Sequence, residues 1–289
     1  ETRRMAALNE KVRAYRAERM PLKRDEKILT AWNGQMIAAL SRAYQATGEE
    51  GYLLAAVRAA LFAKKHLIRP EGDLAIHFQN GRTMGDGLLD DYAWLSEGAL
   101  SLYRATLEDR WLRLAVSLAR QMLERFEDRE QGGFFLTPHG GEKLVARPKE
   151  TYDGAQPSGN AAALFVLVTL SMLDIGEGWA EAAERQRAFL SGLMADAPLQ
   201  HMASLTAAMP LIYPVTLLDA RALPQDNKRL LEKLRSRYLP LLFLKATEPG
   251  AGGSSWHVCQ GHTCLKPFQE MDAALSSLPQ QPNFPDFTS

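Results

Sequence analysis

The feature that most constrains the fold is a series of helical segments joined in pairs by very short connections. Apolar residues recur with helical periodicity over 2–19, 31–47, 50–67, 89–106, 108–126, 158–174, 177–194 and 199–209. Three connections, at 47–49, 106–107 and 175–176, are only two or three residues long. Because such short loops place consecutive helices antiparallel, the pattern predicts helical hairpins.

The two helices of each predicted hairpin differ in polarity. Segment 31–47 is rich in Ala, Ile and Leu, and 158–174 is apolar all round, whereas the second helices carry more charge. A helix without a polar face is buried on every side. We therefore predict a mainly α fold, a partial α/α toroid with an inner and an outer ring. A plain repeat solenoid is the competing architecture, and the unequal spacing of the units favours the toroid.

Short extended segments are expected at 74–78, 133–137 and 143–147, as β-hairpin loops bounded by turn-forming residues. From about Tyr213 the pattern changes to strand, helix, strand and a Gly-rich loop with a third strand, followed by a short helix around 272–275. The predicted division is a toroid over 1–212, a small α/β appendage over 213–277 and an extended tail over 278–289.

Charge excludes some functions. The 34 Lys and Arg residues balance the 34 Asp and Glu residues, so no broad field attracts nucleic acid or anionic lipid. No apolar run reaches the roughly 20 residues of a membrane span, and no secretory signal opens the sequence. Cytoplasmic localisation is expected, with no nucleic-acid or membrane partner.

The starts of the inner helices of a toroid open at one end, so polar residues there can meet although they lie far apart in sequence. At the first start, Trp32 and Asn33 follow Asp25 and Lys27. An indole beside an amide suits a pyranose, which stacks on the ring and bonds the amide. A core Trp at a helix start is the alternative.

At the second start, Asp90 and Asp91 precede Tyr92. Two carboxylates at a helix start are explained by capping and by the helix dipole. Alternatively, one of them caps the helix and the other faces a pocket as a general acid or base, or as a ligand acceptor.

The third start is a dense polar loop that leads into the most apolar helix. A surface loop does not need so many special residues, which favours a functional role. The candidate catalytic residue here is Asp153, and the candidate ligand-binding residues are Arg147, Lys149, Glu150, Tyr152, Gln156, Ser158 and Asn160.

At the fourth start, His201 could act as an acid or base near neutral pH, or be a structural histidine held by hydrogen bonds. Cys259 and Cys264 are too few for a disulfide framework and lack redox spacing, so they are interpreted as buried thiols flanking a turn between strands. His257 and His262 allow a metal site there, but no metal or cofactor is predicted. No phosphate-loop or zinc-protease motif occurs.

Several motifs in their order resemble the YyaL-type family, the thioredoxin-domain proteins related to spermatogenesis-associated protein twenty. They are DEKILTAWNG (25–34), DDYA (90–93), GFFLT (133–137), RPKE (147–150), YDG (152–154), PSGN (157–160) and CQG (259–261) with Cys264. The resemblance implies a toroid similar to the six-hairpin glycosidases and sugar 2-epimerases. It also implies an N-terminal thioredoxin-like domain as a partner and further hairpins, neither of which this sequence contains.

One departure bears on mechanism. Epimerases of that fold use two histidines on inner helices, and only His201 is so placed here. A carboxylate mechanism with Asp90, Asp91 or Asp153 therefore fits better. The leading hypothesis is a carbohydrate-active enzyme, a hydrolase or isomerase, that binds a small sugar-like ligand. A binding module for the thioredoxin-like domain and a scaffold without a pocket are the alternatives.

Overall fold

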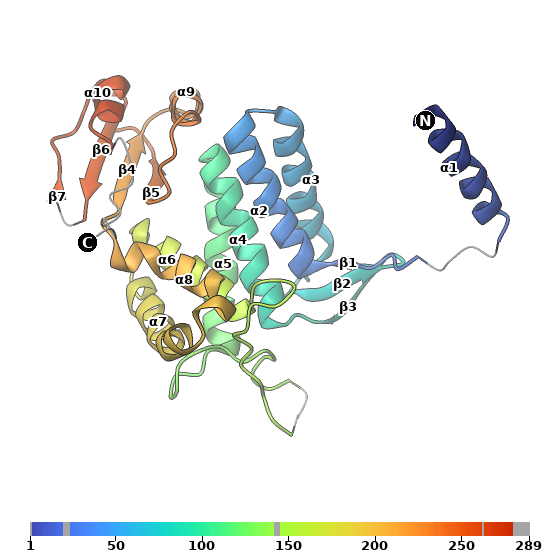
Figure 1. The fold of residues 1–289 in the computed structure, drawn as a ribbon. Coiled ribbons are helices and arrows are strands. Elements are labelled where there is room, and N and C mark those ends of the chain that lie inside the picture. The colour runs from blue at the N-terminus through green and yellow to red at the C-terminus, as the bar shows by residue number, and fades with distance from the viewer. Residues whose placement is uncertain (1, 20–23, 142–144, 262, 280–289) are drawn as a thin grey trace.

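The computed structural model describes residues 2–19, 24–141, 145–261 and 263–279, and most of them form helices (Figure 1). After α1 (Thr2–Ala17) come three hairpins and a single helix. The hairpins are α2 (Thr30–Thr47) with α3 (Glu50–His66), α4 (Leu89–Thr106) with α5 (Asp109–Phe126), and α6 (Gly159–Met172) with α7 (Trp179–Asp196). The last helix is α8 (Met202–Ile212), preceded by a short 3-10 turn, Pro198–Gln200.

The helices form an inner and an outer layer. The inner helices pack in order, with α4 between α2 and α6 and with α8 against α6, while α3, α5 and α7 each pack on the preceding inner helix. Nearly every residue of α4 and α6 is buried, whereas α3 buries only Ala56, Ala60 and Ala63. The prediction of a mainly α, partial toroid of hairpins is confirmed.

Two glycines allow α2 and α4 to approach closely. A Cβ on Gly34 would lie 2.5 Å from the backbone carbonyl of Trp94, and one on Gly98 would lie 2.8 Å from the Gly34 oxygen. Both separations are shorter than side-chain contacts permit, so the first two hairpins can meet in this way only with glycine at these positions.

We predict that Gly34→Ala destabilises the protein by about 1–3 kcal/mol, because the added methyl forces the two helices apart. The matched control is Gly192→Ala inside α7, where an added Cβ meets nothing within 4 Å. That change should stabilise by about 0.5–1 kcal/mol through helix propensity. Urea unfolding measures both, and equal effects would contradict the close packing of α2 on α4.

A small antiparallel sheet lies beside the start of α2. Its strands are β1 (Ile28–Leu29), β2 (Ala75–Gln79) and β3 (Arg82–Asp86), in the order β1-β2-β3. The extended segment predicted at 74–78 corresponds to β2. At 133–137 the structure has an isolated bridge from Phe134 to Glu127 instead of a strand. The segment predicted at 143–147 begins outside the described residues, and 145–147 is not a strand.

The C-terminal part is an α/β unit with strand order β5-β4-β6-β7. Its elements are β4 (Thr216–Arg221), α9 (Pro224–Leu234), β5 (Leu242–Thr247), β6 (Ser255–Gln260), β7 (Thr263–Cys264) and α10 (Met271–Ser276). Strands β4 and β5 are parallel, as a strand–helix–strand unit requires. The Ala246 N–H donates to the Tyr103 hydroxyl at 2.8 Å and so joins this unit to α4. The domain boundaries stay predictions.

The prediction of free, buried thiols at Cys259 and Cys264 is wrong. The two residues face each other across the antiparallel pair β6–β7 and form a disulfide. Neither residue is fully buried. Directly opposed positions bring the Cβ atoms of neighbouring strands close together, which places the sulfurs within bonding reach. His262 lies outside the described residues.

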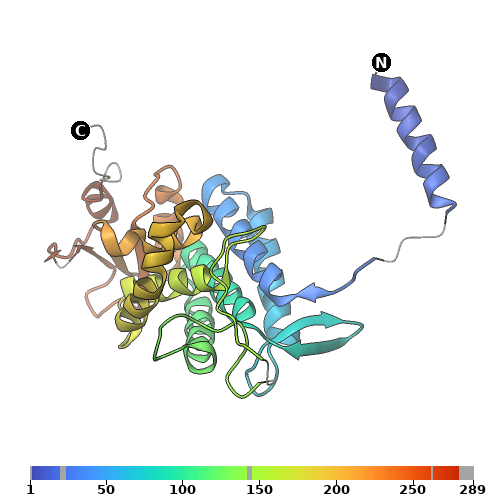
Figure 2. The same ribbon diagram turned by 60° about the horizontal axis from the view of Figure 1, so that its bottom comes forward.

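The first helix lies outside the packed layers and sheets described above. α1 buries none of its residues and stands apart from the helical layers in Figures 1 and 2. No described helix combines the length and the apolar character needed to span a membrane. The predicted tail at 278–289 lies, from residue 280, outside the described residues.

Candidate functional site

The Asp91 carboxylate joins the starts of two neighbouring inner helices. Its Oδ2 accepts the Leu88 N–H at 2.9 Å, which caps its own helix, α4. Its Oδ1 accepts the Ala31 N–H at 3.0 Å, in the first turn of α2. Both oxygens of this buried side chain therefore bind the otherwise unsatisfied N–H groups of helix starts.

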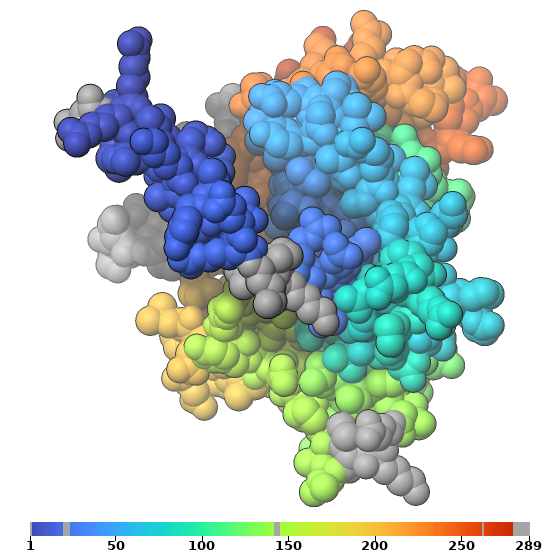
Figure 3. Space-filling model, turned by 90° about the vertical axis from the view of Figure 1, so that its right-hand side faces the viewer, coloured from blue at the N-terminus to red at the C-terminus, as the bar shows by residue number. Residues whose placement is uncertain are grey.

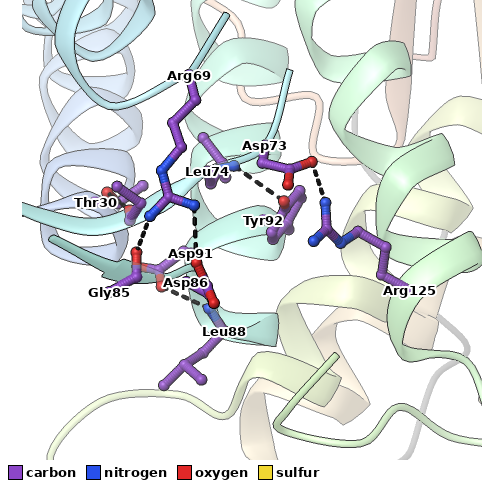
Figure 4. Close-up of polar contacts among 11 residues, drawn as sticks. Thr30, Arg69, Asp73, Leu74, Gly85, Asp86, Leu88, Asp91, Tyr92 and Arg125 are labelled. Atoms are coloured by element: carbon purple, nitrogen blue, oxygen red, sulfur yellow. Dashed lines mark hydrogen bonds and ion pairs between the residues drawn. The ribbon is translucent and has the colours of Figure 1, made fainter. Parts of the chain in front are cut away.

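A polar network surrounds this junction (Figure 4). The Tyr92 hydroxyl accepts the Leu74 N–H at 3.0 Å, and Arg69 contacts Asp86 at 2.8 Å beside Leu88. Arg125 pairs with Asp73 on the other side of the Tyr92 ring. Tyr92 was a candidate ligand residue, but it is 1% exposed and packs in the core.

Asp153 makes the equivalent junction between α6 and α8. Its Oδ1 accepts the Ser158 N–H at 3.0 Å, and its Oδ2 accepts the Ala203 N–H at 2.8 Å. Ser158 in turn caps α6, because its hydroxyl accepts the Ala161 N–H at 3.2 Å. The third and fourth helix starts are thus bonded to each other.

Asn160 fixes the long loop that precedes α6. The side chain is fully buried, and it exchanges hydrogen bonds with the backbone N–H and carbonyl of Phe134 at 2.9 and 3.0 Å. Its amide also donates to the Glu150 carbonyl at 2.8 Å, and Gln186 donates to its oxygen at 3.1 Å. All of its polar atoms are used within the protein.

Trp32 lies at the end of the inner helices where the starts of α2, α4, α6 and α8 come together, and this end is called the mouth below. Its side chain is 61% exposed, and its Nε1 donates to Gln156 Oε1 at 3.1 Å, across 124 residues of sequence. Gln35, one turn further along α2, donates to the same oxygen at 3.3 Å. Figure 3 shows the blue start of α2 against the yellow-green loop that contains Gln156. Gln35 was missed in the sequence, although its spacing from Trp32 places both on one helix face.

Among Asp90, Asp91 and Asp153, Asp90 has the fewest hydrogen-bond partners. It is half-buried and lies against the backbone of Gly159, where any Cβ would overlap its Oδ1. Burial, and to a lesser extent the charge of Glu150, raises the pKa of Asp90 to about 6. The hydrogen bond from the Gly159 N–H lowers this pKa but does not offset the rise. Burial also raises the pKa of Asp91 to about 7, and the Leu88 and Ala31 N–H groups only partly offset it.

His201 is buried beside the same loop. Its Nδ1 lies 3.0 Å from the Ala197 carbonyl and its Nε2 lies 3.4 Å from the Thr151 hydroxyl. The Asp153 N–H also donates to the Gln200 carbonyl at 2.9 Å, so the loop and the start of α8 are held together. Both imidazole nitrogens already have partners.

The other candidates lie around the mouth in different settings. Asn33 donates to the Leu29 carbonyl at 2.8 Å. Lys149 pairs with Asp128 at 2.7 Å, and Arg147 stacks over the Phe135 ring at 4.0 Å. Asp25 and Lys27 form an exposed pair at 3.2 Å, upstream of α2. The candidates free to meet a ligand are therefore Trp32, Asp90, Glu150, Tyr152 and Gln156, and their roles in binding and catalysis stay predictions.

The sequence is similar to those of several curated proteins. Spermatogenesis-associated protein 20 of Rattus norvegicus is 29% identical over 258 residues, which are 84% of this chain and 32% of that protein. The chain is a homologue of spermatogenesis-associated protein 20. The human protein of that name is 27% identical over 250 residues, and an uncharacterized protein of Caenorhabditis elegans is 32% identical over 154. The chain spans about a third of the length of the first of these relatives. No family model matches.

Among solved structures the chain is similar to carbohydrate-active enzymes. A cellobiose 2-epimerase from Bacillus thermoamylovorans has a TM-score of 0.49 at 15% identity, covering 59% of this chain and 46% of that one. A family 76 glycoside hydrolase, a mannosidase from Bacteroides thetaiotaomicron, has a TM-score of 0.46 at 16% identity, covering 56% and 44%. These likenesses assign no activity to the chain.

The raised pKa values predict how stability depends on pH. The folded protein holds protons on Asp90 and Asp91 that the unfolded chain, with pKa values near 3.8, has already released. This contribution to the free energy of unfolding is complete below about pH 4 and is lost as pH rises through 6 and 7. Asp90→Asn should therefore match the parent at pH 4 and be about 1–2 kcal/mol more stable at pH 8, a value reduced for partial solvation. Urea unfolding at both pH values measures this. A difference in free energy of unfolding between variant and parent that is the same at pH 4 and pH 8 would contradict the raised pKa of Asp90.

Proposed function

We propose that the mouth at the starts of α2, α4, α6 and α8 binds a sugar, and that the protein is a carbohydrate-active enzyme in which Asp90 acts as acid or base. The observation that carries the proposal is the contrast between neighbouring carboxyls. Asp91 and Asp153 each accept two backbone N–H groups, whereas Asp90 has the single N–H of Gly159 as its backbone partner. A half-buried carboxyl with a pKa of about 6 can take up and release a proton within about one pH unit of neutrality.

Glu150 is the best second carboxyl. It is exposed, and its charge reaches Asp90 strongly enough to raise the pKa of that group. Its backbone is fixed by the Asn160 amide. Glycoside hydrolysis uses two carboxyl groups, one of them an acid with a raised pKa, and Asp90 and Glu150 are our candidates for this pair. Hydrolysis suits these groups better than a two-histidine epimerisation, since both nitrogens of His201 already have protein partners.

Trp32 supports the choice of a sugar. The exposed indole offers a flat apolar face, and the amides of Gln35 and Gln156 lie at its polar edge. A pyranose ring stacks on such a face while its hydroxyls bond to amides.

The experiment is a hydrolysis screen with chromogenic glycosides, preceded by a thermal-shift screen of sugars for binding. We predict that Asp90→Asn and Glu150→Gln each lower kcat by a factor of about 100 or more without losing melting temperature. Glu181→Gln, on the exposed side of α7, is the matched control and should retain full activity. If a sugar binds but no glycoside is hydrolysed, the assignment as an enzyme is contradicted. If no sugar changes the melting temperature and no glycoside is hydrolysed, the sugar site itself is contradicted.

A second candidate function is docking of the thioredoxin-like domain that the family resemblance implies. It rests on exposed apolar side chains near the mouth, namely Trp32, Met36, Tyr152, Leu199 and Met202. Exposed apolar side chains that form a contiguous surface mark an interaction site. Binding of that domain in trans that is weakened by Met36→Ser and Leu199→Ser, with no sugar bound by the parent, would favour this candidate.

A further inference from the structure

A cavity that opens to solvent lies at the opposite end of the inner helices from the mouth. It has a volume of about 490 Å³ and is lined by the last turns of α2 and α4, the end of α9, the segment after it, and β5. In Figure 1 the upper ends of α2 and α4 face α9 and β5. Arg104 and Asp90 both belong to α4 and are separated by about 20 Å along its axis, at 1.5 Å per residue. The cavity is therefore independent of the proposed sugar site.

The lining of this cavity is strongly basic. Among its described lining residues there are four arginines, Arg42, Arg104, Arg235 and Arg237, and no Asp or Glu. The whole sequence has equal numbers of acidic and basic residues, so the lining of this cavity holds an excess of positive charge. The acidic residues of the region line an adjoining pocket that shares Arg235 and Tyr44 with the cavity, namely Glu50, Glu108, Asp109, Glu232 and Glu248. Two tyrosines, Tyr44 and Tyr238, line the same space.

The partners of these arginines leave most of the charge uncompensated. Arg42 pairs with the buried Glu97. Arg235 stacks over the Tyr44 ring at 5.2 Å, and Arg237 donates to neutral carbonyls, that of Leu275 at 2.6 Å among them. Within the described part of the chain, Arg42 is thus the one arginine of the four that forms an ion pair with a carboxylate.

Among the four arginines, Arg104 is the one with a buried nitrogen that lacks a hydrogen-bond partner within the described part of the chain. That nitrogen is its Nε, and the rest of the side chain is half-buried along the cavity wall. Burial, and then the charge of Arg42, lowers the pKa of Arg104. The negative end of the α4 dipole favours a cation here, but it supplies no hydrogen bond to the guanidinium. A buried donor beside a like charge is costly unless an anion completes it.

We propose that this cavity binds a phosphate monoester of a small organic molecule, with Arg104, Arg42 and Arg235 around the phosphate. A phosphate carries nearly two negative charges and three strong acceptor oxygens, which match several guanidinium groups better than one carboxylate does. The volume exceeds that of the phosphate group and leaves room for a small organic part beside the two tyrosines.

The test is thermal denaturation of the whole chain with inorganic phosphate or glucose 6-phosphate, each compared with sodium chloride at equal ionic strength and with glucose. We expect a saturable rise of several degrees with both phosphates, larger with the ester, and no such rise with chloride or glucose. Arg104→Met should weaken phosphate binding at least tenfold and, without phosphate, melt at or above the parent, because an unpaired charge has been removed. The matched control, Arg58→Met on the exposed face of α3, should respond as the parent does.

Two results would overturn the proposal. One is a rise in melting temperature that chloride reproduces at the same ionic strength, since screening alone would then explain it. The other is a response of Arg104→Met equal to that of the parent. If Arg104→Met does not fold, amide hydrogen exchange of the parent decides. Phosphate should slow exchange at Thr106 and in 235–240, and unchanged exchange there would also overturn the proposal.

Discussion

The structure depends on carboxylates that bind the N–H groups at the starts of two helices at once. The first turn of a helix leaves backbone donors without partners, and burying them unsatisfied is costly. Asp91 satisfies donors of α4 and α2, and Asp153 satisfies donors of α6 and α8. These bonds fix how far each inner helix extends relative to its neighbour. Helix starts from four distant parts of the sequence consequently lie around one mouth.

This bonding explains how adjacent carboxyls can have different properties. Asp91 is fixed at both oxygens and cannot turn toward a ligand without releasing a helix start. Asp90, the preceding residue, points instead to the start of α6 and lies against Gly159, with the charge of Glu150 nearby. By fixing the start of α4, Asp91 therefore positions Asp90, the carboxyl that we propose as acid or base. At the other end of α4, Arg104 belongs to a separate, basic cavity.

The helices could be predicted closely because apolar periodicity and two- or three-residue connections leave few other arrangements. The meeting of Trp32 with the 147–160 loop could also be predicted, since hairpin alternation brings inner-helix starts to one end. Which Asp would bind backbone and which would stay available could not, because it depends on the N–H groups that each side chain reaches. Three features depend on tertiary contacts that leave no local pattern in the sequence. They are the hydrogen bonds of Asn160 to the preceding loop, the Cys259–Cys264 disulfide and the cavity lined by Arg104.

Amide hydrogen exchange at the helix starts tests the central claim most directly. The account predicts that the Ala31, Leu88, Ser158 and Ala203 N–H groups are protected in the parent. Asp91→Ala should then release Ala31 and Leu88 together, on two different helices, while Ser158 and Ala203 stay protected. Fast exchange at Ala31 in the parent, or an Asp91→Ala variant in which only Leu88 changes, would contradict the shared bonding of the helix starts.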